Sequence, residues 1–298
     1  MIHTFSKSHN KVAIIGAAGR MGLWFTKYFI SNGFQTTVSD LKTEEVKKTA
    51  QKTGAFLASD NKTAVHDSDY VFLCTPIRTT SSVITELLPH MKKGSILAEI
   101  TSIKNRTIEA LNKTSEYGIN PLSIHPMFGP STASIEGVTI VVVPVKNIGF
   151  EEMITKNLFP EANIQIADPN EHDKLMSINL SLTYFINLAL GSTLLSEDII
   201  KLKSLAGTSF TLQLALLESI VNEDPQLVEA LLFENMYNLE YVEKFIHEIN
   251  QLRELVKEKG KIRDVLKKLR QHFEMDPDFS FSDKRRYDVY KALIKKKE

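Results

Sequence analysis

The stretch Lys11-Val-Ala-Ile-Ile-Gly-Ala-Ala-Gly-Arg-Met-Gly22 decides the fold of this 298-residue chain. Its β-branched first half predicts a buried strand, and the apolar spacing from Leu23 onwards predicts a helix. A strand, a glycine-rich turn and a helix in this order are typical of a dinucleotide-binding unit. The glycines let the backbone approach a pyrophosphate, and the helix N-terminus offers it unpaired N–H groups.

A second strand, Thr36–Ser39, is predicted to end at Asp40, close to the distance at which a carboxylate binds the ribose 2′-hydroxyl. An acidic residue there repels a 2′-phosphate, so NAD is favoured over NADP, although Lys42 lies close by. The predicted cofactor contacts of this unit are Gly16, Ala18, Gly19, Arg20, Met21, Gly22 and Asp40.

The first half of the chain alternates short apolar strands with helical stretches, which is typical of a parallel, doubly wound sheet. The further buried-strand candidates are Tyr70–Cys74, Ser95–Ile100, Ile140–Val143 and Ile164–Ile166. We therefore expect a Rossmann-type dinucleotide-binding domain over residues 1–167.

The pattern changes at Asp168-Pro169-Asn170-Glu171, which combines an N-cap, a proline at the first helical position and a capping-box glutamate. The helix that follows is apolar on most faces, so we expect it to be buried. Asp224-Pro225 opens another helix, whose periodicity continues towards Gly260. No strand is predicted after Ile166, so residues 168–298 are expected to form an all-helical domain for substrate binding and dimerisation.

Composition excludes several functions. The formal net charge is zero, which argues against nucleic acid as a partner. No apolar run reaches the roughly 18 residues of a membrane span, and Met1–Lys11 is too polar for a signal peptide. Cys74 is the single cysteine, which fits a reducing compartment, and no metal site is indicated. We therefore expect a cytoplasmic protein.

A histidine with potential chemistry lies in Ser123-Ile-His-Pro-Met-Phe-Gly-Pro130. His125 stands at the end of an apolar segment that Pro126 terminates. Ligands of open α/β sheets bind at the carboxyl ends of the strands, which makes His125 a candidate catalytic group. The alternative is a histidine that caps a turn.

The chain resembles the prephenate/arogenate dehydrogenase family, the oxidative decarboxylases of tyrosine biosynthesis, over nearly its whole length. The resemblance rests mainly on four blocks, with a fifth at Glu171–Met176 that looks like the start of the family's central helix. The four blocks are Gly19-Arg20-Met21-Gly22, Leu73-Cys74-Thr75-Pro76-Ile77, Ile100-Thr101-Ser102-Ile103-Lys104 and His125-Pro126-Met127-Phe128-Gly129.

The resemblance implies an NAD-dependent oxidoreductase that converts prephenate to 4-hydroxyphenylpyruvate in aromatic amino acid biosynthesis. His125 would be the base that takes the hydroxyl proton. Ser102 would orient His125 or bind the substrate hydroxyl, or would act as the N-cap of a helix over Ile103–Ala110. Further cofactor contacts would be Cys74, Thr75, Pro76 and Thr101.

Substrate recognition departs from the family pattern. Tyr184 stands where family members usually have a histidine, so Thr183 and Tyr184 are predicted to contact substrate, with a core aromatic as the alternative for Tyr184. Lys104 is predicted to meet a substrate carboxylate or to be a solvated helix lysine. Leu205–Leu214 lacks the family's carboxylate-clamping arginine. The candidates to replace it are Lys201, Lys203, Arg253, Arg285 and Arg286, or a residue of a partner subunit.

Other functions remain alternatives at this point: an arogenate dehydrogenase, a nucleotide-binding regulatory protein without turnover, and an enzyme resembling dihydrodipicolinate reductase. The helical half carries apolar stripes over Pro225–Leu255 and at Ile262, Val265, Leu266 and Leu269, more than about 130 residues can bury alone. We therefore expect a homodimer through the helical domain.

Overall fold

The computed structural model describes residues 10–258 and 261–294, and the chain divides into two compact units. The first unit runs to Met176 and also includes Glu229–Asn235. The second takes Ser177–Val228 and the chain from Met236 onwards. Most of Met1–Lys11 and the predicted helix end at Gly260 lie outside the described residues.

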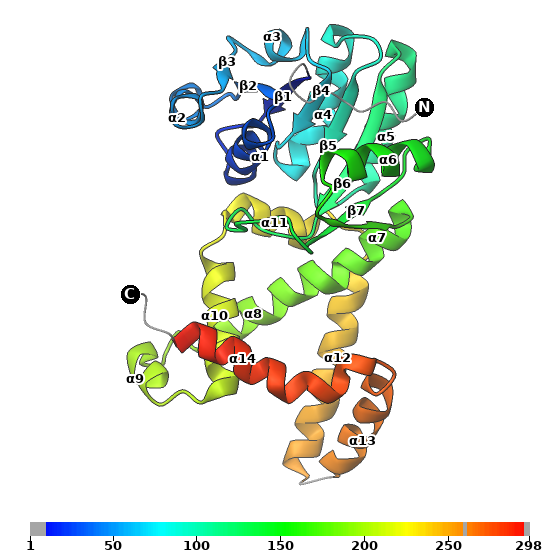
Figure 1. Ribbon diagram of the computed structural model, residues 1–298. Helices are drawn as coiled ribbons and strands as arrows, with labels where there is room; N and C mark the ends of the chain where they lie inside the picture. Colours follow the sequence, from blue (N-terminus) through cyan, green and yellow to red (C-terminus); the bar gives the residue numbers. More distant parts are fainter. Residues whose placement is uncertain (1–9, 259–260, 295–298) are drawn as a thin grey trace. The chain divides into compact units, whose positions relative to one another are not determined.

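The first unit is built on an eight-stranded sheet with the order β3-β2-β1-β4-β5-β6-β7-β8 (Figure 1). Every neighbouring pair is parallel except β6 and β7, which run antiparallel. The strands are β1 (Lys11–Ile15), β2 (Gln35–Ser39), β3 (Phe56–Leu57), β4 (Tyr70–Leu73), β5 (Ile96–Glu99), β6 (Asn120–Pro126), β7 (Thr139–Val142) and β8 (Asn163–Ile166).

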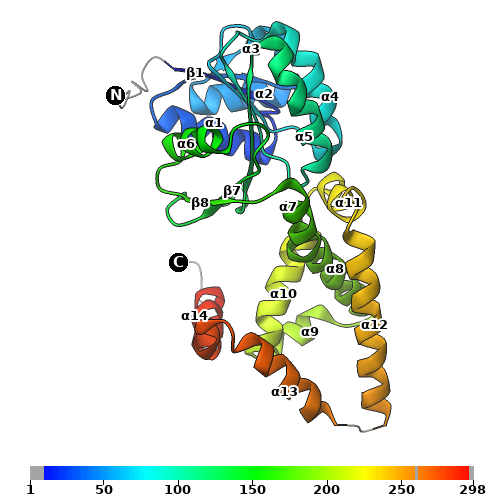
Figure 2. The same ribbon diagram turned by 90° about the vertical axis from the view of Figure 1, so that its right-hand side faces the viewer.

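Helices cover both faces of this sheet, as in a doubly wound fold (Figure 2). One face packs against α1 (Arg20–Ser31), α2 (Thr43–Thr53) and α6 (Ile148–Leu158). The other packs against α3 (Asn61–Val65), α4 (Ile77–Leu87), η2 (Leu88–His90) and α5 (Asn105–Leu111), with η3 (Asn112–Tyr117) following α5. Helix α7 (Pro169–Met176) completes the unit.

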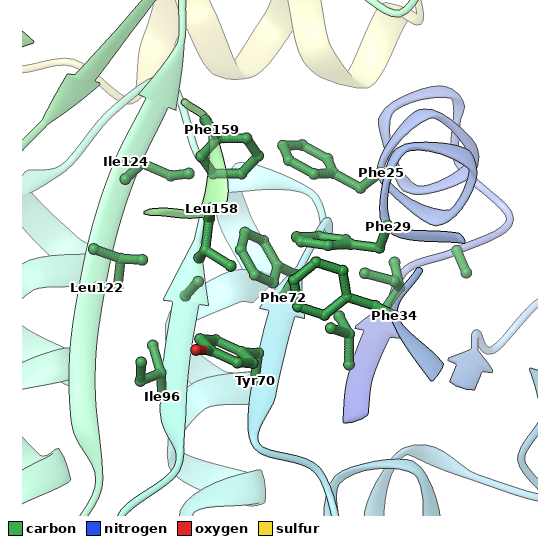
Figure 3. Close-up of a cluster of buried hydrophobic side chains, with 14 of the residues drawn as sticks. Phe25, Phe29, Phe34, Tyr70, Phe72, Ile96, Leu122, Ile124, Leu158 and Phe159 are labelled. Atoms are coloured by element: carbon green, nitrogen blue, oxygen red, sulfur yellow. The ribbon is translucent and has the colours of Figure 1, made fainter. Parts of the chain in front are cut away.

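Alternation along the central strands explains the two cores. Ile14 and Phe72 face the α1 side, whereas their neighbours Ile15 and Leu73 face the α4 side. The α1 side is dominated by aromatic rings, which Figure 3 shows around Phe72. A fully buried phenylalanine side chain contributes about 1.5–3 kcal/mol, so this cluster anchors α1 and the glycine turn that precedes it.

The predicted Rossmann-type sheet is confirmed, and the predicted strands coincide with β1, β2 and β4–β8 apart from the exact ends and the extent of β6. The short strand β3 was not predicted, because two exposed residues carry no alternation signal. The antiparallel β6–β7 pair was also not predicted, because strand direction depends on a non-local connection.

The second unit is helical, and among its described residues no strand occurs. It starts with the π-helical turn η4 (Ser177–Leu182) and α8 (Thr183–Thr193). The remaining elements are α9 (Ile199–Ser204), α10 (Thr208–Val221), the start of α11 (Pro225–Phe233), α12 (Asn238–Lys257), α13 (Ile262–Phe273), η5 (Pro277–Phe281) and α14 (Ser282–Ile294).

Three expectations about the helices are wrong. The long helix from Pro225 is interrupted between Phe233 and Asn238, so it forms α11 and α12. Helix α8 is not buried, since Asn187 is its one fully buried residue. The helical stretch Pro169–Thr193 is long and apolar enough to cross a membrane, by length and composition only, although no such segment was expected.

The compact units divide after Met176, whereas the sequence prediction set the domain boundary between residues 167 and 168. Asp168 does cap α7, since its Oδ1 accepts from Asn170 N at 2.9 Å. Helix α7 nevertheless belongs to the sheet unit, because its His172 and Asp173 are buried there. A helix start seen in the sequence marks a change of secondary structure, which need not coincide with a change of packing.

Candidate active site

The glycine turn between β1 and α1 has the geometry of a phosphate cradle. Gly19 stands at the N-cap of α1 without a side-chain cap, so first-turn N–H groups have no intrahelical partner. A Cβ on Gly16, where φ is +84°, would lie 2.6 Å from Cys74 O. A Cβ on Gly22 would overlap the carbonyl oxygen of Gly16. These two positions therefore require glycine for the turn to pack against β4 and for α1 to pack against the turn.

Asp40 closes the cradle from the end of β2. Its Oδ2 accepts from Ala18 N at 2.9 Å, and its Oδ1 accepts from Lys42 N at 2.9 Å. The carboxylate is thereby held against the glycine turn, beside the place where a dinucleotide's adenosine ribose belongs in this fold. The residues present fit a nicotinamide dinucleotide, which would be held by the turn, the α1 N-terminus and Asp40.

The predicted contacts Cys74, Thr75 and Pro76 lie at the carboxyl end of β4, next to the glycine turn. Cys74 N donates to Ile15 O at 2.8 Å, and Pro76 is the N-cap residue of α4. Burial raises the pKa of the Cys74 thiol, so this cysteine stays protonated and is not a nucleophile. Contact of these three residues with a cofactor stays a prediction.

Polar side chains gather at the carboxyl ends of β5 and β6, on the face that packs against α5. Glu99 on β5 is in register with Ser123 on β6, and His125 follows two residues later on the same face. Glu99 and Ser123 are fully buried, and His125 is 4% exposed. The strand period thus places a buried carboxylate and a buried imidazole on one face of the sheet edge where ligands bind.

His125 is the first member of a hydrogen-bonded series. Its Nδ1 lies 3.0 Å from His172 Nε2, and His172 Nδ1 lies 2.9 Å from Asp173 Oδ1. Asp173 also accepts from Lys104 N at 2.8 Å and from Asn105 N at 2.9 Å. Helix α7 is thereby joined both to the start of α5 and to the end of β6.

The environment keeps His125 neutral. Burial lowers its pKa well below 6.5, and the charge of Lys104 lowers it further. Burial also lowers the pKa of His172, against the opposing effect of its hydrogen bond to Asp173. A neutral imidazole has one nitrogen lone pair available, which a general base requires.

Lys104 departs from both roles predicted for it. It is fully buried, and its Nζ donates to Glu99 Oε1 at 2.7 Å and to Ile124 O at 2.7 Å. It is therefore neither a solvated helix lysine nor a free cation for a substrate carboxylate. The Thr101 hydroxyl is bound to Glu99 and to Ile103 O, and contact of this residue with a cofactor stays a prediction.

Ser102 is half-buried in the segment that joins β5 to α5. Helix α5 begins at Asn105 with Lys104 in the N-cap position, so the interpretation of Ser102 as an N-cap is wrong. An orienting or substrate-binding role for Ser102 stays a prediction.

Thr183 and Tyr184 begin α8 in the second unit and are partly buried, and their contact with substrate stays a prediction. Most of the candidate replacements for the missing arginine have nearby carboxylate partners. Lys203 pairs with Glu218, Arg253 with Glu254, Arg285 with Asp278 and Arg286 with Asp283.

His172 and Asp173 were given no role from the sequence, although both lie within the Glu171–Met176 block. The available signal was the adjacency of a histidine and an aspartate in a helix whose N-cap is already supplied by Asp168. Their link to His125 spans 47 positions of sequence and was not visible from local spacing.

Two family models match this chain. Residues 25–149 match the nucleotide-binding domain of prephenate dehydrogenase, and residues 168–273 match its dimerization domain. A probable arogenate/prephenate dehydrogenase of Methanocaldococcus jannaschii is 30% identical over 88% of this chain and 60% of that protein. The T-protein of Enterobacter agglomerans is 26% identical over 78% of this chain and 59% of that protein. The chain thus spans about 60% of the length of these curated relatives.

Solved structures share the fold. The prephenate dehydrogenase from A. aeolicus, in complex with hydroxyphenyl propionate and NAD+, matches with a TM-score of 0.73 and 21% identity over 91% of this chain and all of that one. The Synechocystis arogenate dehydrogenase matches with a TM-score of 0.66 and 19% identity over 90% of this chain and 99% of that one.

Proposed function

Because the chain belongs to the prephenate dehydrogenase family, we propose that it oxidises prephenate with NAD as hydride acceptor and releases CO₂ to give 4-hydroxyphenylpyruvate. The observation that carries this proposal is the buried, neutral His125 at the carboxyl end of β6. Cytoplasmic tyrosine biosynthesis is the corresponding setting, which a single cysteine fits.

The chemistry needs a base at one atom of the substrate. Prephenate carries a hydroxyl at C4 and a carboxylate at C1 of a cyclohexadiene ring. His125 takes the hydroxyl proton, the C4–H electrons leave as hydride, and the C1–CO₂ bond breaks so that its electron pair completes the aromatic ring. The nicotinamide ring, when bound, supplies the hydride acceptor. A positioned base of this kind contributes about 10²–10⁴-fold to the rate.

A panel assay tests the substrate and the turnover together. Purified protein is mixed with NAD or NADP and with prephenate, arogenate or buffer alone, and the absorbance of the reduced nicotinamide is followed. We expect reduction with prephenate and NAD. Reduction with arogenate alone would assign the amino-acid substrate instead, and binding of NAD without reduction in any arm would indicate a regulatory protein.

Cofactor choice is predicted to depend on Asp40. Its carboxylate, held by Ala18 N and Lys42 N, repels a 2′-phosphate, so kcat/KM should be higher with NAD than with NADP. Asp40→Ser should narrow that preference by raising kcat/KM for NADP. Asp60→Ser serves as the matched control, because Asp60 caps the short helix α3 and should leave the ratio unchanged. Equal kcat/KM for the two cofactors in the unaltered protein would contradict the prediction.

The helical unit has apolar surface that a second copy would cover. On α13 one side exposes Leu266, Leu269 and Phe273, which are about half exposed in the single chain. A hollow of about 590 Å³ between α8 and α10 is lined by side chains such as Leu195 and Val221. Exposed apolar area of this extent favours assembly, and two-fold pairing is the commonest form. We therefore propose a homodimer through the helical unit.

Light scattering at micromolar concentration should give twice the mass of one chain. The same sample should keep its mass in high salt, because apolar contacts are not screened as surface ion pairs are. A monomer mass together with full activity would contradict the dimer.

A further inference from the structure

Asp173 occupies the far end of the hydrogen-bonded series and acts only as an acceptor. The backbone N–H groups of Lys104 and Asn105 can only donate, and both point to its carboxylate oxygens. His172 Nδ1 approaches the same oxygen as Lys104 N. His172 must therefore carry its proton on Nδ1, where it donates to Asp173.

The position of the proton on His172 determines the tautomer of His125. A neutral His172 that is protonated on Nδ1 has a bare Nε2, which can only accept. The atom within hydrogen-bond distance is His125 Nδ1, at 3.0 Å. His125 must then be protonated on Nδ1, which leaves its Nε2 with a free lone pair.

We infer that His172 and Asp173 are positioning residues that hold His125 in the Nδ1–H tautomer, with Nε2 unprotonated and available to a substrate hydroxyl. This inference rests on the proposed role of His125 as base. When Nε2 takes up the hydroxyl proton, the resulting imidazolium still donates from Nδ1 to His172, and Asp173 balances the positive charge through it. The arrangement follows the same logic by which an aspartate sets the histidine tautomer in serine proteases.

Among the described residues, the hydrogen bond of the His125 ring is the one to His172. Lys104 is the nearby cation, and its Nζ is bound to Glu99 and to Ile124 O. The Glu99 carboxylate accepts hydrogen bonds from Lys104, Ser123 and Thr101, and it has no hydrogen bond to either histidine. The Lys104 charge therefore favours neutral His125, while the Asp173–His172 pair selects which nitrogen is protonated.

Two substitutions of His172 separate positioning from filling of space. His172→Phe preserves a ring in a site that is 1% exposed but removes the acceptor for His125 Nδ1–H. His172→Gln fills less of the ring's volume, yet its amide can donate to Asp173 and its oxygen can accept from His125. We expect kcat to fall by about 10²-fold in His172→Phe with KM little changed, and to recover at least tenfold in His172→Gln. A role in packing alone predicts the reverse order, which would overturn the inference.

The tautomer itself is read by ring-nitrogen NMR of the full chain labelled with ¹⁵N-histidine, with NAD bound. The His125 and His172 signals are assigned by their loss in His125→Ala and His172→Gln. We expect His125 to be protonated on Nδ1 and bare on Nε2 at neutral pH, and this pattern should be lost in His172→Phe. Protonation on Nε2 in the unaltered protein would overturn the inference. The measurement does not depend on turnover, so it stands even if neither prephenate nor arogenate is reduced and the proposed function fails.

Discussion

Replacing His125 by alanine is expected to lower kcat by about 10²–10⁴-fold while the affinity for NAD stays close to that of the unaltered protein. The reason is that, in the proposed mechanism, the imidazole acts on the proton that leaves in the transition state, whereas the proposed cofactor cradle consists of the turn after β1 and Asp40. Steady-state kinetics with prephenate gives kcat. Binding of NAD can be followed by the fluorescence of Trp24, the single tryptophan, which lies on α1 close to the glycine turn.

His90→Ala is the matched control, because His90 is an exposed histidine of the same unit at the end of η2. It should leave kcat and the thermal unfolding temperature unchanged. If His125→Ala retained turnover near that of His90→Ala, His125 would be removed from the mechanism. Loss of NAD binding in His125→Ala would instead mean that the substitution has disturbed the fold of the cradle.

The pH dependence of the activity should also depend on His125. Burial and the charge of Lys104 lower the pKa of His125 well below 6.5, so the base is already unprotonated at neutral pH. Activity should therefore be flat from neutral pH downwards through 6.5 and should fall only in more acidic solution, as the imidazole becomes protonated. A rate that already halves near 6.5 would show that the base is an ordinary, solvated histidine.

The second large effect is expected on stability. Lys104→Met should lower the free energy of unfolding by about 3–5 kcal/mol, because it leaves the carboxylate of Glu99 buried without its cation. Both side chains are fully buried, and burial lowers the pKa of the Lys104 ammonium while Glu99 opposes that effect. Urea unfolding followed by circular dichroism measures the change.

Lys92→Met is the matched control, because Lys92 forms an equally short ion pair with Asp69 on the surface. Exposed pairs contribute about 0–1 kcal/mol, so this variant should unfold almost like the unaltered protein. Adding Glu99→Gln to Lys104→Met should recover part of the loss, since the amide keeps hydrogen bonds without an uncompensated charge. A Lys104→Met variant as stable as Lys92→Met would mean that water or a shifted protonation state already relieves the buried pair.

The parts of the fold that were predicted correctly depend on local patterns. The strand, turn and helix from Lys11 onwards follow from a β-branched run, three glycines and the helical apolar spacing after them, and the structure reproduces them. The Asp168 cap is similarly local. The direction of β7 and the break after Phe233 depend on which distant segments they pack against, so no local pattern reported them.

The site divides in the same way. His125 could be proposed from the sequence because a histidine at a strand end is a local feature, and Asp40 because its distance from the glycines is fixed by the βαβ unit. Lys104 was misassigned because charged residues at helix starts are usually solvated, and its partner Glu99 sits within an otherwise apolar strand. Glu99 lies two residues after Leu97 on the same strand, so both side chains are on the face that packs against α5. This spacing could have been used to predict the position of the carboxylate.

Helix α11 has a consequence for how this protein can be cut into fragments. Its second half returns to the sheet unit, where Glu234 binds Arg78 at 2.7 Å and Arg106 at 3.0 Å. Asn235 Nδ2 donates to Asp173 O at 2.6 Å, at the helix turn that supports His125. In a recombinant fragment that stops at residue 176, Arg78 and Arg106 would lose the carboxylate of Glu234 that they share. Helix α7 would lose the hydrogen bond from Asn235. The sheet unit is therefore formed from two separate segments of the chain. A fragment that reproduces it needs residues 229–235 as well, either as a separate peptide or joined through a linker.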